Sequence, residues 1–351
     1  MAITADLDAG DSPVARPTLK TIAAATGLAI ATVSRALKDA PDIGEETKRR
    51  VRETAAQLGY RPNRAGVRLR TGKTNVIALV LSTEVDIMNH TSRLIYSIAN
   101  ALRGTAYHLV VMPFFADQDP MDPIRYLVET ESADGIILNQ TKADDPRIRY
   151  LHAHGVPFAT HGRSDMGIDH LFYDFDNHAF GQLGARALAG RGRRNLLLVA
   201  PPRAQMYANH MIDGFQAQAA RDGLRAEVLD GVTSDSGGEA IEAAIALRFG
   251  QDQPPDGILV GSTTAAMATV AGAERQGRVL GQHFDLVAKE AIPLLRSFRS
   301  AIAIVREDVG RAGEFLARAL VAAIDQRTWA DRQGLEVPDT VEWGPKPRLG
   351  G

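Results

Sequence analysis

Apolar and polar residues follow two different periods along the chain. Up to about residue 60 the apolar residues recur every three to four positions, which is the period of an amphipathic helix. Leu19, Ile22 and Ala23 fall on one face of a first helix. Thr18 can cap the start of that helix, and Gly27 suits its left-handed end. The pattern therefore predicts that the folded chain begins with a short amphipathic helix.

Two more helices follow after short turns, from Leu28 to Leu37 and from Glu45 to Leu58. Val33 and Leu37 can pack against the first helix, which leaves a group of outward-facing side chains: Ile30, Ala31, Thr32, Ser34 and Arg35. A second helix with small polar and arginine side chains facing outward is typical of a recognition helix in the major groove of DNA. An ordinary helical hairpin is the alternative when the pattern is taken alone.

From Thr74 onward, short apolar runs alternate with amphipathic stretches. The runs predict strands near residues 76–81, 108–112, 135–138, 156–159, 171–175, 196–200, 257–260, 286–288 and 301–305. The stretches predict helices near residues 91–103, 123–131, 178–189, 210–221, 238–248, 264–276 and 311–322. Such alternation predicts parallel sheets with helices on both faces. Because one sheet would be too large, we expect an α/β core of two doubly wound halves, with a ligand cleft at the carboxyl ends of the strands.

Charge is divided unevenly between the two parts. From Arg16 to Lys73 there are 13 Lys and Arg against 5 Asp and Glu, whereas from Thr74 onward there are 27 against 34. Residues 16–73, the head, are therefore basic, and the rest of the chain from Thr74, the body, is acidic. A compact basic segment is typical of a module that binds a polyanion, because neutralising phosphates releases counterions. Basic segments also bind membranes and acidic partners, so the helical pattern is needed to favour DNA.

The composition indicates the kind of compartment in which the protein works. The chain has no Cys, which excludes disulfides and Cys-based metal sites and favours a reducing compartment. The first 15 residues lack the apolar core of a signal peptide, and no run of about 18 apolar residues could span a bilayer. We therefore expect a flexible extension over residues 1–15 and a cytoplasmic protein without a membrane partner.

Five sequence segments in the head are similar to those of a known family: Leu19–Ala23, Thr26–Leu28, Ala31–Leu37, Ile43–Thr47 and Leu58–Asn63. Together they resemble the head of the LacI/GalR family of bacterial transcription regulators. The resemblance implies a small all-α helix-turn-helix domain over residues 16–62 that binds DNA through Thr18, Lys20, Ile30, Ala31, Thr32, Ser34 and Arg35. The positions that discriminate operators fall on Ile30 and Ala31, which can read thymine methyl groups but offer no hydrogen bond to a base edge.

Residues 63–73 form a basic segment at the end of the head. By resemblance Asn63 and Arg64 contact the DNA backbone, and the segment becomes a hinge helix only on DNA. Leu69 would then enter the minor groove as a wedge that kinks the duplex. Gly66 and the shortness of the segment make a free-standing helix marginal in water. A solvated basic linker is the alternative.

The body resembles the periplasmic-binding-protein-like core of the same family. The resemblance implies an effector-binding and dimerisation core over residues 74–345 in which the chain crosses between its halves more than once. We expect one half at about 74–160 and 302–330, and the other at about 161–300.

Polar residues at the predicted strand ends are the candidates for binding an effector: Ser82, Thr83, Asn139, His161, Arg163, Asp174, Tyr207, His210 and Glu290. In the family an Arg three residues before a Gly-Phe or Gly-Trp pair grips the effector, and here Met211 stands at that position. The family's late Gly-Tyr-Asp-Asp loop is replaced by residues 288–291, where Glu290 is the nearest substitute. The grip on the effector therefore differs from that of common members.

The sequence favours binding over catalysis. It contains no P-loop, no G-x-S-x-G elbow and no H-E-x-x-H motif. His152 and His154, with His161 and His170 nearby, lack a third ligand at a metal-binding spacing. We therefore expect no catalytic residue, no cofactor and no metal site. An enzyme on a doubly wound scaffold with an accessory DNA head is the rival that these absences leave open.

These inferences combine into a homodimeric, possibly tetrameric, regulator that reads a pseudo-palindromic operator. A mono- or disaccharide in the cleft would change the angle between the halves and so the affinity for DNA. We expect a repressor of a carbohydrate-utilisation operon. A sensor of a non-sugar metabolite and a sugar-binding protein without a regulatory role are the alternatives.

Overall fold

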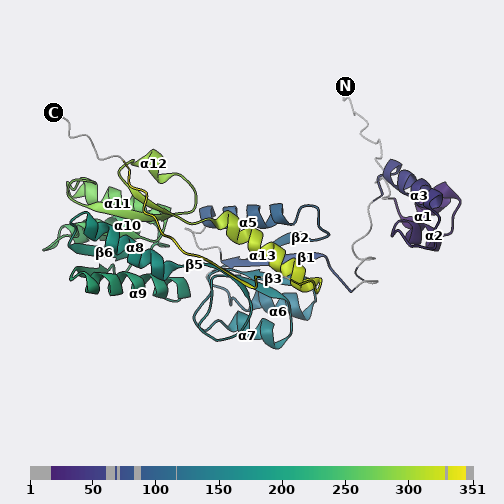
Figure 1. The fold of residues 1–351 in the computed structure, drawn as a ribbon, viewed down its shortest axis with the longest axis horizontal. Helices are drawn as coiled ribbons and strands as arrows, with labels where there is room; N and C mark the ends of the chain where they lie inside the picture. Colours follow the sequence, from purple (N-terminus) through teal and green to yellow (C-terminus); the bar gives the residue numbers. More distant parts are fainter. Residues whose placement is uncertain are drawn as a thin grey trace, which may run out of the picture. The chain divides into compact units, whose positions relative to one another are not determined.

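The computed structural model describes residues 17–60, 68, 72–82, 88–115, 117–328 and 331–344. The chain forms two compact units, Met1–Thr74 and Asn75–Gly351. The first holds the helix-turn-helix head and the second holds the α/β core (Figure 1).

The head consists of α1 (Leu19–Thr26), α2 (Ile30–Ala36) and α3 (Glu45–Gln57). Each helix contributes two buried side chains to one small core: Ile22 and Ala23, Val33 and Ala36, and Val51 and Ala55. Leu37, which the helical period turns inward, ends α2 and is only partly buried against this core. Gly27 follows α1 with a φ of 68°, which is the left-handed conformation predicted for it.

The core contains two parallel sheets, as the alternating pattern predicts. The first sheet has the strand order β11-β5-β4-β3-β1-β2. Its strands are β1 (Val76–Ser82), β2 (His108–Phe114), β3 (Gly135–Leu138), β4 (Phe158–His161), β5 (Leu171–Phe175) and β11 (Gln333–Glu336). β1 is apolar from Val76 to Leu81, as expected for a strand whose two faces are both covered.

Helices cover the two faces of the first sheet separately. α5 (Met88–Ala101) and α13 (Val309–Ile324) pack on one face, and α6 (Asp122–Glu129) and α7 (Pro146–Ala153) pack on the other (Figure 1). Each face has its own apolar cluster, with Leu94 and Leu316 in one and Ile124 and Ile148 in the other. The first sheet with these four helices is the first subdomain.

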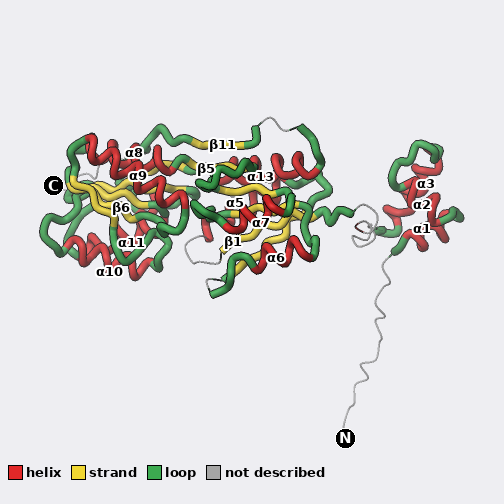
Figure 2. Tube along the Cα trace, turned by 90° about the horizontal axis from the view of Figure 1, so that it is seen from below, coloured by secondary structure: helices red, strands yellow, loops and turns green. Residues whose placement is uncertain are grey.

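The second subdomain repeats the plan on a sheet of order β10-β9-β8-β6-β7. The strands are β6 (Asn195–Val199), β7 (Arg225–Val228), β8 (Gly257–Val260), β9 (Asp285–Glu290) and β10 (Ala303–Arg306). The helices are α8 (Asn177–Gly190), α9 (Met206–Arg221), α10 (Gly238–Phe249), α11 (Thr263–Arg275) and α12 (Leu295–Phe298). α8 and α9 lie on one face of the sheet, and α10 and α11 on the other (Figure 2).

α8 and α9 approach each other backbone to backbone. A Cβ added to Gly181 would meet the carbonyl oxygen of Met211, and one added to Gly214 would meet the carbonyl oxygen of His178. Glycine at these two positions is therefore what lets the two helices pack so closely.

The described chain passes between the subdomains at three places: after β5, after β10 and after β11. After β11 it returns to the second subdomain, where Glu342 bridges Ile304 of β10. The repeated crossing agrees with the expectation, but its positions correct the predicted division. Residues 161–175 belong to the first subdomain because β5 pairs with β4, whereas β10 belongs to the second because it pairs with β9.

Four elements of the core lie outside the predicted pattern: β7, β11, α7 and α12. β7 and β11 are edge strands with the sequences RAEV and QGLE, which are too polar to read as buried strands. α7 follows a polar turn, but Asp145 as its N-cap and Pro146 at its first position are the usual signals of a helix start. Among the helices that the structure describes, none is both long and apolar enough to cross a membrane.

Candidate functional site

The outer face of α2 carries the candidate DNA-reading side chains. Val33 and Ala36 turn inward, so Ile30, Ala31 and Arg35 are exposed and the Ile30 side chain keeps 46% of its surface open. Thr32 and Ser34 are half-buried beside them. The outer face of α2 thus presents an apolar side chain at Ile30 and a cationic side chain at Arg35.

Two of the candidate DNA-binding residues of the head, Arg35 and Thr18, also make contacts within the head. Arg35 forms an ion pair with Asp42 on the loop before α3. The Thr18 hydroxyl accepts a hydrogen bond from the Thr21 amide at 3.3 Å, and the Thr18 amide donates to the Thr21 hydroxyl at 3.1 Å. This reciprocal cap fixes the start of α1, and Lys20 is exposed on its first turn. Asn63, Arg64 and Leu69 of the predicted hinge lie outside the described residues.

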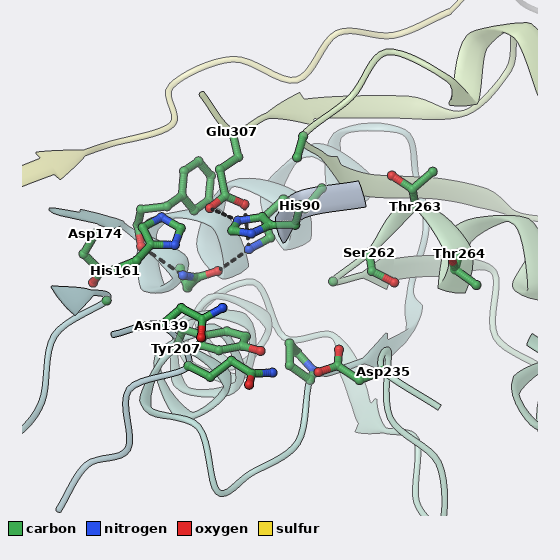
Figure 3. A pocket seen from close by; sticks show the side chains of 18 of the residues that line it. His90, Asn139, His161, Asp174, Tyr207, Asp235, Ser262, Thr263, Thr264 and Glu307 are labelled. Carbon is green, nitrogen blue, oxygen red and sulfur yellow. Dashed lines mark hydrogen bonds and ion pairs between the residues drawn. The ribbon is translucent and has the colours of Figure 1, made fainter. Parts of the chain in front are cut away.

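A cavity of about 130 Å³ lies between the two subdomains of the core. The first subdomain contributes Asn139, His161 and Asp174 from its strand ends, and the second contributes Tyr207 and Lys289. The cavity thus forms where the carboxyl ends of both parallel sheets converge, as expected for doubly wound folds. Figure 3 shows His90, His161 and Glu307 together on one side and Ser262, Thr263 and Thr264 on the other.

The side with His90 is a charged network. His90 Nε2 lies 3.3 Å from Glu307 Oε1, and Lys289 Nζ lies 3.0 Å from Glu307 Oε2. Burial alone would raise the pKa of Glu307, but Lys289 and His90 more than offset it and hold that pKa well below its usual value. Burial, with His90 nearby, lowers the pKa of His161 to about 3. At neutral pH this wall therefore offers a carboxylate, an ammonium and a neutral imidazole.

Asp174, in the same wall, is only partly ionised at neutral pH. Its Oδ2 lies 2.8 Å from Arg163 Nε, but burial outweighs that pairing and raises the pKa of Asp174 to about 7. Next to it, Lys289 Nζ lies 5.2 Å from the ring centroid of Phe175 and 5.7 Å from that of Tyr207. The aromatic faces thus help to hold the ammonium in place.

The opposite side is hydroxyl-rich and held by local hydrogen bonds. Ser262 Oγ donates to the carbonyl of Ser234 at 3.0 Å and accepts from the Ala265 amide at 3.2 Å, which caps α11. Ser234 Oγ donates to Asp235 Oδ1 at 2.9 Å. These contacts bring the turn before α10 to the start of α11, so that Asp235 and Thr263 face one cavity.

His90, His161 and Glu307 could also hold a metal ion, since one ligand atom of each lies within 4.8 Å of the others. The Lys289 ammonium already occupies the second oxygen of Glu307. A divalent cation at this point would be repelled by that ammonium at short range.

Comparisons with known proteins match both units. The profile of bacterial regulatory proteins of the lacI family matches residues 18–63. The profile of periplasmic binding proteins and the sugar binding domain of the LacI family matches residues 76–287. This chain belongs to the LacI family of bacterial regulatory proteins.

Individual relatives agree with the LacI-family profiles. The chain is 30% identical over 316 residues to the HTH-type transcriptional regulator AglR of Rhizobium meliloti, covering 87% of each chain. It is 31% identical over 280 residues to the HTH-type transcriptional regulator RafR of Escherichia coli, covering 78% of this chain and 82% of RafR.

Solved LacI-family structures share the fold. The lac repressor dimer bound to operator and the anti-inducer ONPF superposes with a TM-score of 0.81 at 18% identity, covering 95% of this chain and all of that one. The complex of transcriptional regulator CelR with cellobiose gives a TM-score of 0.65 at 22% identity, covering 94% of this chain and all of that one.

LacI-family proteins are DNA-binding transcriptional regulators with sugar-binding domains, and they are not enzymes. The predicted family, fold class and non-enzymatic nature are thereby confirmed. The rival enzyme on a similar scaffold is set aside by the same matches.

The structure brings together only some of the predicted effector residues. Asn139, His161, Asp174 and Tyr207 line the cavity, and Arg163 stands behind Asp174 as its ion-pair partner. Ser82 lines a second, neighbouring cavity. Thr83 lies outside the described residues.

Three further predicted effector residues, Met211, Glu290 and His210, line neither cavity. Met211 is fully buried in the apolar cluster beneath α9 because its helical position faces the sheet. Glu290 is buried, and its Oε1 accepts the amides of Leu294 and Leu295 at 2.8 and 2.7 Å, so it holds a loop. His210 is half-buried on α9, one helical turn beyond Tyr207.

His90, Lys289 and Glu307 are cavity residues that the sequence reasoning did not select. His90 lies in a helix and Glu307 follows a strand that the prediction gave to the other half. Lys289 stands directly after a predicted strand, and its position at a carboxyl end was the one usable signal.

Proposed function

We propose that this protein is a repressor of a carbohydrate-utilisation operon whose affinity for its operator is set by a small sugar in the cleft. The active form is a dimer that reads a pseudo-palindromic operator with two heads. Binding of the sugar releases the operator.

The observation that carries this proposal is that both subdomains supply walls of one cavity in a chain that also carries a helix-turn-helix head. A ligand held between two subdomains binds best at one relative arrangement of them. It can therefore shift the population of arrangements by its difference in affinity, and operator DNA must affect sugar binding reciprocally.

The chemistry of the cavity suits a sugar. Sugar hydroxyls donate and accept hydrogen bonds, and the walls offer acceptors at Glu307 and Asp235, a donor at Lys289 and an amide at Asn139. The rings of Phe175 and Tyr207 provide apolar faces for the C–H groups of a pyranose. The CelR complex with cellobiose supports a sugar ligand in this fold.

The proposed dimer is supported by apolar side chains around the edge strand β2. Val110 and Val111 on β2, Tyr96 on α5 and Tyr126 on α6 are all exposed. An exposed apolar edge of a sheet is normally covered by a partner, and a second copy of the chain would cover it.

In the head, we assign Thr32, Ser34 and Arg35 to phosphate or base-edge contacts, with Thr18 and Lys20 at the backbone. Ile30 and Ala31 would touch thymine methyl groups. The hinge assignment of Asn63, Arg64 and Leu69 belongs to the same proposal.

The test is to select an operator from random-sequence DNA and to measure its affinity for the full-length protein with a panel of sugars. We expect one sugar to weaken operator binding by tenfold or more, on the order of 1–3 kcal/mol of coupling. Absence of any effect across neutral sugars, together with a response to a non-sugar metabolite, would overturn the sugar assignment.

Asn139→Leu supplies the matched variant. Asn139 is buried, and within the described residues its Oδ1 has no hydrogen-bond partner, so the substitution keeps the branched shape of the side chain and removes a polar group that could bind the sugar. We expect weaker sugar binding with unchanged operator affinity in the absence of sugar. Asn100→Leu on the exposed end of α5 is the control and should change neither.

A further inference from the structure

A second cavity, of about 170 Å³, adjoins the first at Gln140, which lines both. It is walled by strand ends of the first subdomain and by the start of α9 in the second. Its lining includes Ser82, Phe114, Phe115, Gln118, Gln140 and Gln205. Because the two cavities adjoin at one residue, together they suit a ligand made of two linked units.

The residue between the cavities is held in an unusual backbone conformation. Gln140 has a φ of 51°, in the left-handed region that side-chain-bearing residues seldom adopt. Arg147 fixes it there, because its Nη2 donates to the carbonyls of Asn139 and Gln140 at 3.1 and 3.0 Å. Asp145, fully buried, holds that guanidinium through bonds of 2.9 and 2.7 Å. Because these bonds hold the Gln140 backbone in its left-handed conformation, the Gln140 side chain stays at the junction of the cavities.

Two amide groups at the second cavity remain unsatisfied. Gln140 Nε2 and Gln205 Oε1 are buried and find no hydrogen-bond partner within the described part of the chain. Gln205 occupies the N-cap position of α9 and is only 8% exposed, yet its side chain does not cap the helix. Unpaired buried polar groups are costly, so they point to a ligand with matching groups. A hydroxyl matches both, since it accepts from one amide and donates to the other.

Two aromatic side chains also line the second cavity. Phe114 ends β2, and Phe115 beside it is 55% exposed. The face of an aromatic ring is electron-rich and attracts the weakly positive C–H groups of a ring ligand. Exposed phenylalanine next to unpaired amides matches the two kinds of surface that a pyranose has.

The charges argue for a neutral occupant. The first cavity is lined by Asp174, Asp235 and Glu307, whereas no carboxylate is among the described residues that line the second. Two cations also line the second cavity, but Asp145 balances the charge of Arg147 through bonds to its Nε and Nη2, which leaves Lys142 as the other cation on this wall.

We propose that the second cavity binds a second pyranose ring, so that the effector is an oligosaccharide of at least two units. This inference rests on the proposed sugar-controlled function and specifies its ligand. The first ring occupies the cavity at His161 and Lys289, and the second lies against Phe114 and Phe115. Gln140 contacts the ligand at the junction of the rings. Gln205, from the other subdomain, contacts the second ring, so that chain length is coupled to the arrangement of the subdomains.

The experiment is calorimetric titration of the full-length protein with glucose and galactose, with maltose, cellobiose, melibiose and sucrose, and with glucose 6-phosphate. We expect one disaccharide to bind about tenfold or more tightly than its component monosaccharides. Phe115→Ala and Gln205→Leu should each remove most of that advantage while changing monosaccharide affinity less than twofold. Leu247→Ala, which removes an exposed apolar side chain on α10 that has no role in either cavity, is the control and should leave the advantage intact.

Three results would overturn the second-ring proposal while sugar control stands. The first is a monosaccharide that binds as tightly as every disaccharide, and the second is glucose 6-phosphate as the tightest ligand. The third is that Phe115→Ala and Gln205→Leu lower the affinity for monosaccharides as much as the affinity for disaccharides. If no sugar of either length binds or alters operator affinity, the proposed function fails and the second-ring proposal fails with it. Thermal melting of each variant separates loss of a contact from loss of the fold.

Discussion

The head and the cleft present their polar side chains in opposite ways. In the head, the outer face of α2 comes from seven consecutive residues, and Ile30, Ala31 and Arg35 are exposed. In the cleft, His90, Asp174 and Glu307 come from distant segments and meet beneath the surface of the core. The head is therefore suited to reach a large external polyanion, and the cleft to enclose a small ligand.

The difference has electrostatic consequences. Arg35 and Asp42 are both about half exposed, so solvent screens their ion pair and exchange of Asp42 for a DNA phosphate costs little. In the cleft, burial shifts the pKa of His161 to about 3 and that of Asp174 to about 7. The exposed Arg35–Asp42 pair is therefore weakly coupled, whereas the buried groups of the cleft depend strongly on one another.

Deletion of the head should have the largest effect on operator binding. Deletion of residues 1–73 removes the first compact unit up to its boundary and leaves the second complete. We expect specific operator binding to be lost while sugar affinity stays within about twofold, measured by fluorescence anisotropy and calorimetry. A truncated protein that still shifts operator DNA would show that the head is not the DNA-binding part.

A methyl group added between α8 and α9 should lower the stability of the core and leave the head unchanged. Gly214→Ala forces a Cβ against the His178 carbonyl between α8 and α9, where overpacking costs about 1–3 kcal/mol or more. We expect a lower melting temperature for the core and an unchanged far-UV signal from the head. Gly190→Ala, at the end of α8 with nothing within 4 Å, is the matched control and should be neutral.

Arg35→Ala should weaken operator binding by about 1–3 kcal/mol if the guanidinium contacts a base edge. The core and its sugar affinity should not change. Asp42→Ala frees the same guanidinium from its ion pair without removing it and should keep or improve operator affinity. If both substitutions weaken binding equally, the ion pair matters for the fold of the head and Arg35 is not a DNA contact.

The smallest effect is a pH dependence of core stability that two cleft residues set in opposite directions. His161 has its pKa lowered from 6.5 to about 3, so the unfolded state binds more protons in that window and stability rises with pH there. Asp174 has its pKa raised from 3.8 to about 7, so the folded state binds more protons and stability falls as pH rises through that window. In the native protein the two trends oppose each other wherever the windows overlap.

Single substitutions should expose each trend. Asp174→Asn removes the falling trend, so we expect the stability of the core to rise with pH up to about pH 6.5 because of His161. His161→Gln removes the rising trend, so we expect the stability to fall with pH up to about pH 7 because of Asp174. Each slope is at most about 1.4 kcal/mol per pH unit. Denaturant titrations at several pH values measure this, with Asp42→Asn on the exposed head as the control. Parallel pH profiles for the two cleft variants would contradict the assigned burial.

The elements could be predicted where their own residues carry the signal. The three head helices and the apolar strands such as β1 and β8 follow directly from period and composition. β7 and β11 could not be predicted in that way, since edge strands are half solvated and their sequences are mostly polar. Their pairing with β6 and β5 stabilises them instead.

The site was most predictable near the carboxyl ends of strands. Asn139 follows β3, His161 ends β4 and Asp174 lies near the end of β5, and all three line the cavity. Met211 and Glu290 were chosen by analogy with family positions, but one packs into the apolar core and the other holds the loop at Leu294.

The sequence by itself determined the two kinds of unit, the basic recognition helix and the family, because these depend on neighbouring residues and on local period. Only the tertiary structure decided which sheet receives β5 and β10, because a short apolar strand can pair with either. It also decided that His90, Lys289 and Glu307 share one wall, since their contact depends on where the chain crosses between the subdomains.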